Sequence, residues 1–319
     1  MLLTGEILSI IVAMTWTVTA LCAEVASRRM GQLQMNVLRM AASLVILWVV
    51  LWALTGQPLP QGMPPRAVAW LLASGAVGYV FGDWCLFSSY VLIGSRMGQL
   101  FMTLAPLFSA LAAWVLLGEV LGLQAIAGII VTLCGIAIVV LHRGSHSSST
   151  QKAVADGSVP SFDKKTGGAS DIPLRGILLG IGAGMGQGVG IVLSKVGMEL
   201  CEPSVLLPMA ATMVRAVAGL VGFGCAFYFK GSMQRLREGL HDRTTMGAAA
   251  GAIVTGPVIG VSLSLLAVQL APAGIASTLM ALTPIFILWP SRWLFGQRIT
   301  AREVLGSCIA VVGVALFFL

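Results

Sequence analysis

Two stretches of the sequence decide the fold: residues 102–118 read MTLAPLFSALAAWVLLG, and residues 280–296 read MALTPIFILWPSRWLFG. Each contains a Leu-x-Pro-x-Phe motif, with a glycine ten positions after the phenylalanine. The same offset of 178 residues aligns 92–141 with 270–319 without a gap. Matched prolines and glycines set bends and close helix contacts rather than mere hydrophobicity. They therefore indicate an internal repeat and make Pro106 and Pro284 candidates for helix bends.

The repeat extends to the first helices of the two copies. At an offset of 171 residues, Gly5, Ser9, Ala13 and Thr17 fall on Gly176, Gly180, Gly184 and Gly188. Small residues every four positions predict a stripe on which a neighbouring helix packs closely, with Gly184 and Gly188 at its centre. The run 180–190 places further glycines on the opposite face, so it favours close packing on two sides or a helix that bends during transport.

Composition places these copies in a membrane. The chain of 319 residues is 57% hydrophobic and 10% charged, whereas soluble domains carry about 25% charged residues. A bilayer-spanning helix needs about 20 mostly apolar residues. We therefore predict an all-α integral membrane protein of the inner cell membrane, with ten transmembrane helices in the lipid bilayer, near 4–24, 34–54, 67–92, 97–117, 122–141, 174–195, 204–229, 246–269, 275–295 and 301–319.

Polar segments divide the predicted domains. Residues 142–173 are rich in Ser, Gly and charge, which predicts a flexible linker between a first repeat at 1–141 and a second at 174–319. The basic segment 230–245 is predicted as a loop or a short interfacial helix. His142 and His146 are the one pair that could share a metal, but zinc sites usually use three or four ligands. We predict no metal and no cofactor.

An odd number of helices in each copy predicts that the second copy enters the membrane from the opposite side. Inverted repeats are typical of secondary transporters, whose binding site lies at the repeat interface near the midplane. Fifteen of the nineteen Lys and Arg fall on one predicted side, which the positive-inside rule makes cytoplasmic. This charge count places both termini outside.

The combined pattern resembles the EamA-type transporters of the drug/metabolite transporter superfamily. It consists of two five-helix halves, a proline in each fourth helix, Leu-Leu-Gly-Glu at 116–119 or Leu-Phe-Gly-Gln at 294–297, and a fifth helix with spaced glycines. The resemblance implies uptake or export of a small metabolite, such as an amino acid, driven by a gradient rather than by ATP. Members usually have cytoplasmic termini, which disagrees with the charge count, and the linker here is longer than theirs.

Asp83 stands within the third predicted helix, and its repeat mate is Val261. A charge inside a bilayer is costly, so it normally faces a cavity or a partner. Asp83 is therefore expected to bind a proton or a cationic substrate group, or to form a structural ion pair. Arg39 and Arg215 are mates in the second helices. They are expected to bond carbonyls at a helix end or to hold a substrate carboxylate or phosphate.

Glu24 and Lys195 are also mates, at the ends of the first helices, and are candidates for gating or simple interfacial charges. The remaining candidates to line a substrate cavity are Gln187, its mate Trp16, Tyr79, Trp84 and Gln99.

Other function classes are poorly supported. The basic residues lie in short loops and show no nucleic-acid-binding motif, and no ATP-binding GxxxxGK[ST] motif occurs. A membrane enzyme needs several convergent acids, histidines or a nucleophile pair, whereas the three His lie in polar stretches. A non-transporting sensor on the same scaffold stays open. The expected partners are a small-molecule substrate, lipid and, as a candidate coupling ion, the proton. The sequence does not indicate an oligomeric state.

Overall fold

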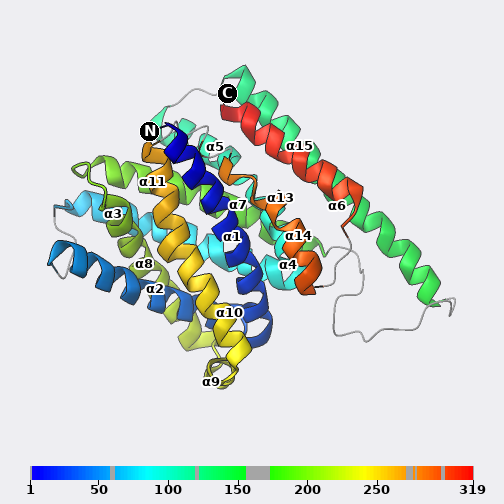
Figure 1. Ribbon diagram of the computed structural model, residues 1–319, viewed down its shortest axis with the longest axis horizontal. Helices are drawn as coiled ribbons and strands as arrows, with labels where there is room; N and C mark the ends of the chain where they lie inside the picture. Colours follow the sequence, from blue (N-terminus) through cyan, green and yellow to red (C-terminus); the bar gives the residue numbers. More distant parts are fainter. Residues whose placement is uncertain are drawn as a thin grey trace.

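The computed structural model describes residues 2–57, 62–118, 122–155, 173–270, 276, 279–295 and 299–318. In this part of the chain all regular structure is helical (Figure 1). The first copy contains α1 (Leu2–Met30), α2 (Gln32–Thr55), α3 (Pro65–Gly75), the π-helix η1 (Ala76–Asp83), α4 (Trp84–Met102), α5 (Ala105–Leu117) and α6 (Leu123–Ala155). The second contains α7 (Leu174–Glu199), α8 (Leu207–Lys230), α9 (Met233–His241), α10 (Arg243–Ile253), η2 (Val254–Val261), α11 (Ser262–Leu270), α13 (Thr283–Phe286), α14 (Leu288–Phe295) and α15 (Ala301–Phe318).

Among the described residues, seven helical stretches are long and apolar enough to cross a membrane, and Ala105–Leu116 is a shorter apolar helix. The protein is therefore a multi-pass membrane protein. One of the seven stretches, Pro65–Met102, joins the predicted third helix to the start of the predicted fourth. Gly94 interrupts it with a positive φ of 83°, a backbone conformation that glycine adopts readily and other residues rarely do. This break falls between the two predicted spans.

The predicted fourth and ninth helices are not continuous. The chain leaves the helix at residues 103–104, before α5, and again at 281–282, before α13. These positions are repeat mates. Pro106 and Pro284 both stand in the first turn after the break. Proline lacks the backbone N–H that a continuous helix would need and disfavours helical geometry at the preceding residue, so the break precedes it.

The third and eighth predicted helices each contain a π-helical segment of eight residues that the hydrophobic pattern did not predict. η1 and η2 occupy positions exactly matched by the 178-residue offset. Both carry glycines at matched positions, Gly78 with Gly256 and Gly82 with Gly260. In η2, Pro257 also removes a hydrogen-bond donor. π-helical turns are rare and frequently occur at functional sites.

Two pairs of mate helices pack antiparallel to each other. The end of α2 contacts the start of α8 through Leu51 and Ala210, and α6 and α15 run side by side along one edge of the molecule (Figure 1). Gly135 packs on Gly306, and their respective mates Gly313 and Gly128 pack on each other. Such reciprocal contacts are what a twofold relation between two copies produces.

The first helix of each copy packs on the other copy. One glycine stripe of α7 contacts α4 and α5: a Cβ at Gly184 would lie 2.9 Å from the carbonyl oxygen of Phe101, and a Cβ at Gly188 would overlap that of Ala105. The opposite stripe contacts η1, where Gly186 meets Gly82 and Gly190 meets Gly78. Both faces of the glycine-rich helix are thus closely packed.

The two polar segments differ from each other. The basic segment 230–245 contains the amphipathic helix α9, which lies at one end of the molecule (Figure 1). Of the predicted linker, residues 142–155 continue α6 as a helix, so its start at 142 is not a change of secondary structure. Residues 156–172, and the side chains of His142 and His146, lie outside the described part of the chain.

Candidate functional site

Three elements converge on a buried polar cluster. Asp83, the last residue of η1, forms an ion pair with Arg39 of α2. Gln187 of α7 donates a hydrogen bond of 2.8 Å to the other Asp83 carboxylate oxygen and one of 3.1 Å to the carbonyl of Gly78. Asp83 and Arg39 are 4% and 5% exposed. Because Gln187 belongs to the second copy, the cluster bridges the two copies.

Arg39 is held by further contacts within the first copy. Its guanidinium donates to the Asn36 side-chain oxygen at 3.4 Å and lies 4.7 Å from the centre of the Phe87 ring. Its Nε is buried and has no hydrogen-bond partner among the residues that the structure describes. The ion pair that the sequence analysis left open for Asp83 is therefore formed, with the arginine expected either to bond carbonyls or to hold a substrate.

Arg215 approaches the same cluster from α8. It is 5% exposed, and its guanidinium lies 4.6 Å from the centre of the Tyr79 ring. A Cβ at Gly78, whose carbonyl accepts from Gln187, would lie 3.0 Å from its Nη2. Within the described ranges, the buried Nε of Arg215 and the buried hydroxyl of Tyr79 both lack a hydrogen-bond partner. Arg39 and Arg215, the matched arginines of the two second helices, thus both lie at this one cluster, next to η1 of the first copy.

The matched position in the other copy is apolar. Where Gln187 meets Gly82, its mate Trp16 meets Gly260 of η2. Trp16 packs against Val12 and Ala267, and the mate of Asp83 is Val261. A hydrogen bond of 2.8 Å joins the hydroxyls of Thr19 of α1 and Thr255 of η2. Trp16 therefore does not join the polar cluster.

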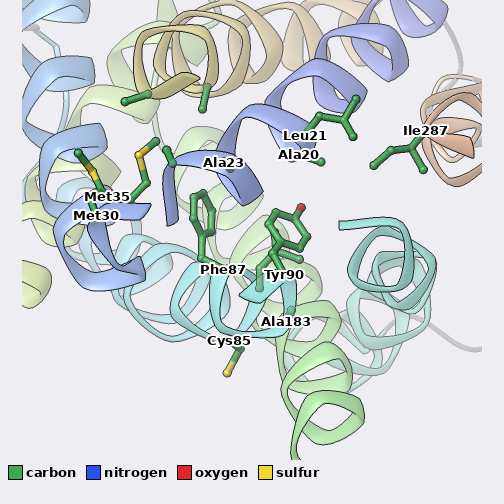
Figure 2. Packing of buried hydrophobic residues seen from close by; sticks show 14 residues of the cluster. Ala20, Leu21, Ala23, Met30, Met35, Cys85, Phe87, Tyr90, Ala183 and Ile287 are labelled. Atoms are coloured by element: carbon green, nitrogen blue, oxygen red, sulfur yellow. The ribbon is translucent and has the colours of Figure 1, made fainter. Parts of the chain in front are cut away.

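Gln99 and Tyr90 form a neighbouring polar contact. Gln99 donates a hydrogen bond of 2.7 Å to the Tyr90 hydroxyl. Figure 2 shows Tyr90 and Phe87 on the same side of α4, pointing toward α1. Their ring centres are 5.6 Å apart. Since Phe87 also faces Arg39, the aromatic pair connects Gln99 to the cluster.

Trp84 follows Asp83 directly but lies on the outside. It is 40% exposed and lines an open apolar groove of about 990 Å³ between η1 and α8. Val80 and Phe81 line the same groove, with Lys230 at one end. η1 thus separates this groove from the polar cluster. Val80, Phe81 and Trp84 line the groove, whereas Tyr79 and Asp83 face the cluster.

The two gating candidates differ in their surroundings. Glu24 is 1% exposed; it accepts hydrogen bonds from the backbone N–H of Ser95 at 2.6 Å and from Arg28 Nε at 2.9 Å. It thereby holds the chain just after the break at Gly94. Lys195 is exposed and lies 3.9 Å from Glu199. Arg28 and Glu199 are themselves mates, so the two helix ends carry one ion pair in reversed order.

A second buried ion pair was missed by the sequence analysis. Arg96 donates to Glu303 at 2.5 Å, and both are nearly inaccessible to solvent. The charge count had treated Arg96 as a loop cation, and Glu303 sits at the start of the last helix. The sequence signal for this ion pair was an acidic residue, Glu303, at the boundary of a predicted span. Among the described residues, no group of three or more His, Cys, Asp or Glu forms a metal site.

Comparisons with known proteins agree with this architecture. The profile of the EamA-like transporter family matches residues 3–141 and 174–319. A search of the curated proteins gave no match. A crystal structure whose title names no function is similar over 99% of this chain and 96% of its own, with a TM-score of 0.59 and 15% identity, which supports the fold alone. Since the family profile covers both copies, the chain belongs to the EamA-like transporter family.

Proposed function

We propose that this protein is a secondary transporter that moves a small metabolite across the inner cell membrane by alternating access. In this proposal it crosses the bilayer ten times, as two inverted five-helix copies. The antiparallel packing of α2 with α8 and the reciprocal glycine contacts of α6 with α15 support the inversion. Inverted copies that rock against each other expose a central site to alternate sides.

The observation that carries the proposal is the cluster of Asp83, Arg39 and Gln187. It is buried and charged, and it spans the boundary between the copies. A contact across that boundary changes when the copies move relative to each other. Asp83 is also the charge that the repeat does not share, as expected of a residue that serves binding rather than the scaffold. We assign it the binding of a proton or of a cationic substrate group.

The test is transport by purified protein in proteoliposomes, loaded with a metabolite mixture and assayed with and without an imposed proton gradient. We expect the wild type to accumulate or release particular metabolites and Asp83→Asn to lose at least about tenfold in rate, the equivalent of 1.4 kcal/mol. Glu238→Gln, on exposed α9, is the control acid and should retain the wild-type rate. Unchanged transport and pH dependence in Asp83→Asn would exclude the assigned role.

A variant pair separates structure from function at this site. Asp83→Asn leaves Arg39 as an unpaired buried charge, which costs about 3–5 kcal/mol in proteins. The double variant Asp83→Leu/Arg39→Met replaces the pair by apolar groups and should recover most of that stability. If it also recovers transport, the pair is purely structural. Ligand binding without any transport would indicate a sensor instead.

A further inference from the structure

The polar cluster does not balance its own charge. Arg39 is paired with Asp83, but Arg215 has no carboxylate within ion-pair distance among the described residues. Counting Arg39 and Arg215 as +1 each and Asp83 as −1, the cluster carries a net charge of +1. A buried cation without a partner is unfavourable. The face of Tyr79 offsets part of this cost, since aromatic rings attract cations.

Unpartnered donors accompany that charge. The Nε of Arg215 and the hydroxyl of Tyr79 are both buried and have no hydrogen-bond partner in the part of the chain that the structure describes. Buried polar groups normally have one, so each such exception requires an explanation. The guanidinium of Arg215 lies over the Tyr79 ring and beside Gly78, whose carbonyl accepts from Gln187. The Nε of Arg39 is a third such donor, so the cluster combines three donors with one net positive charge at the copy interface, as an anion site requires.

We propose that Arg215, with the Tyr79 hydroxyl, binds the anionic group of the transported substrate. This rests on the proposed transport function and narrows it: the substrate carries a carboxylate or a phosphate. The planar guanidinium suits either group, because it donates parallel hydrogen bonds to two oxygens. The Arg39–Asp83 pair then positions the neighbouring part of the site.

The experiment measures thermal unfolding of the detergent-solubilised full chain against matched acid and amide probes: acetate and acetamide, isovalerate and isovaleramide, phenylacetate and phenylacetamide. Methyl phosphate tests the other source of negative charge. We expect at least one anion to raise the unfolding temperature while its amide does not. Stabilisation by no anion, or equally by acid and amide, would overturn the proposal. Whether a carboxylate or the phosphate gives the response decides which of the two the substrate carries.

Variants connect any response to this site. Arg215→Gln should abolish anion stabilisation, and Arg215→Lys should retain part of it. Arg66→Gln removes an exposed arginine and should respond like the wild type. Tyr79→Phe removes a hydroxyl without a partner, so it should leave the unliganded protein as stable as before and weaken anion affinity by about tenfold. Tyr79→Phe thus tests the site even if Arg215→Gln fails to fold. Unaltered affinity in Tyr79→Phe and Arg215→Lys would refute the assignment.

Transport measurements distinguish this inference from the function it rests on. If proteoliposomes transport only metabolites that carry neither a carboxylate nor a phosphate, the anion site is wrong and the transporter stands. If the acid probes bind through Arg215 but no metabolite crosses the vesicle membrane, the transporter is wrong and the anion site stands.

Discussion

Glu24 and Lys195 occupy matched positions in the two copies, but only the Glu24 side chain is buried. Its carboxylate accepts from the backbone of Ser95 and from Arg28, whereas Lys195 and Glu199 form an exposed pair at 3.9 Å. Glu24 thus connects the end of α1 to the segment that follows Gly94, whereas Lys195 and Glu199 at the end of α7 are exposed to solvent. At the scale of residues, the two copies therefore differ in whether the matched charge contacts the backbone of another segment.

This difference predicts unequal costs for removing the two charges. Glu24→Ala leaves the buried N–H of Ser95 without its acceptor and should cost roughly 1–3 kcal/mol. Lys195→Ala removes a solvent-exposed ion pair and should cost at most about 1 kcal/mol. Denaturant or thermal unfolding of the two variants in one detergent measures both. Equal losses would mean that the Ser95 contact contributes nothing to stability.

At the scale of elements, α7 owes its central position to its glycines. The two stripes let α5 and η1 approach so closely that a Cβ at Gly188 would overlap the backbone of Ala105. That backbone cannot move aside as a flexible side chain could. Gly224 of α8 is a matched control, since a Cβ there would meet no atom within 4 Å.

We therefore expect Gly188→Ala to destabilise the protein by roughly 1–3 kcal/mol, the usual cost of overpacking. Gly224→Ala should be neutral or stabilise by up to about 1 kcal/mol, because alanine favours the helix. Thermal unfolding midpoints of the two variants check this. A tolerated Gly188→Ala would contradict the close packing of α7 on α5.

A second element, the junction of α9 and α10, carries a pH dependence. Asp242 caps the N-terminus of α10 and accepts from the Thr245 hydroxyl at 2.5 Å and from Arg29 at 2.8 Å, as well as from the backbone N–H groups of Thr244 and Thr245. These contacts lower the pKa of Asp242 to about 2. Its pKa in the unfolded chain is about 3.9, so the stabilisation is complete above that pH and is lost as the pH falls toward 2.

We expect amide hydrogen exchange at the start of α10 to accelerate between about pH 4 and pH 2 beyond the intrinsic pH effect. Asp242→Asn should show faster exchange already at pH 5 and no additional change in that window. The same profile in both proteins would show that the carboxylate does not hold the junction.

At the scale of the whole molecule, the repeat was readable because prolines and glycines keep their spacing. Pro106 and Pro284 located the breaks at 103–104 and 281–282 to within a few residues. The hydrophobic pattern did not predict the π-helices, because η1 and η2 are as apolar as the helices around them. The sequence signal for them was four glycines at matched positions.

Asp83 could be identified from the sequence as an unfavourable charge inside the membrane. Its partners could not be identified, because residues 39, 83 and 187 meet only through tertiary packing.

The same comparison makes sidedness testable. Basic residues of the described chain gather around α9, among them Arg29, Arg235 and Arg237, while Arg66 and Lys195 lie in the segments predicted for the other side. The positive-inside rule then predicts that α9 lies in the cytoplasm and that both termini lie outside, opposite to the usual orientation of the family. In a variant without native cysteines, a membrane-impermeant maleimide should label Lys195→Cys in intact cells and Arg235→Cys only after permeabilisation. Labelling in the reverse order would contradict this orientation. It would place the start of the first helix and the end of the last helix on the cytoplasmic side.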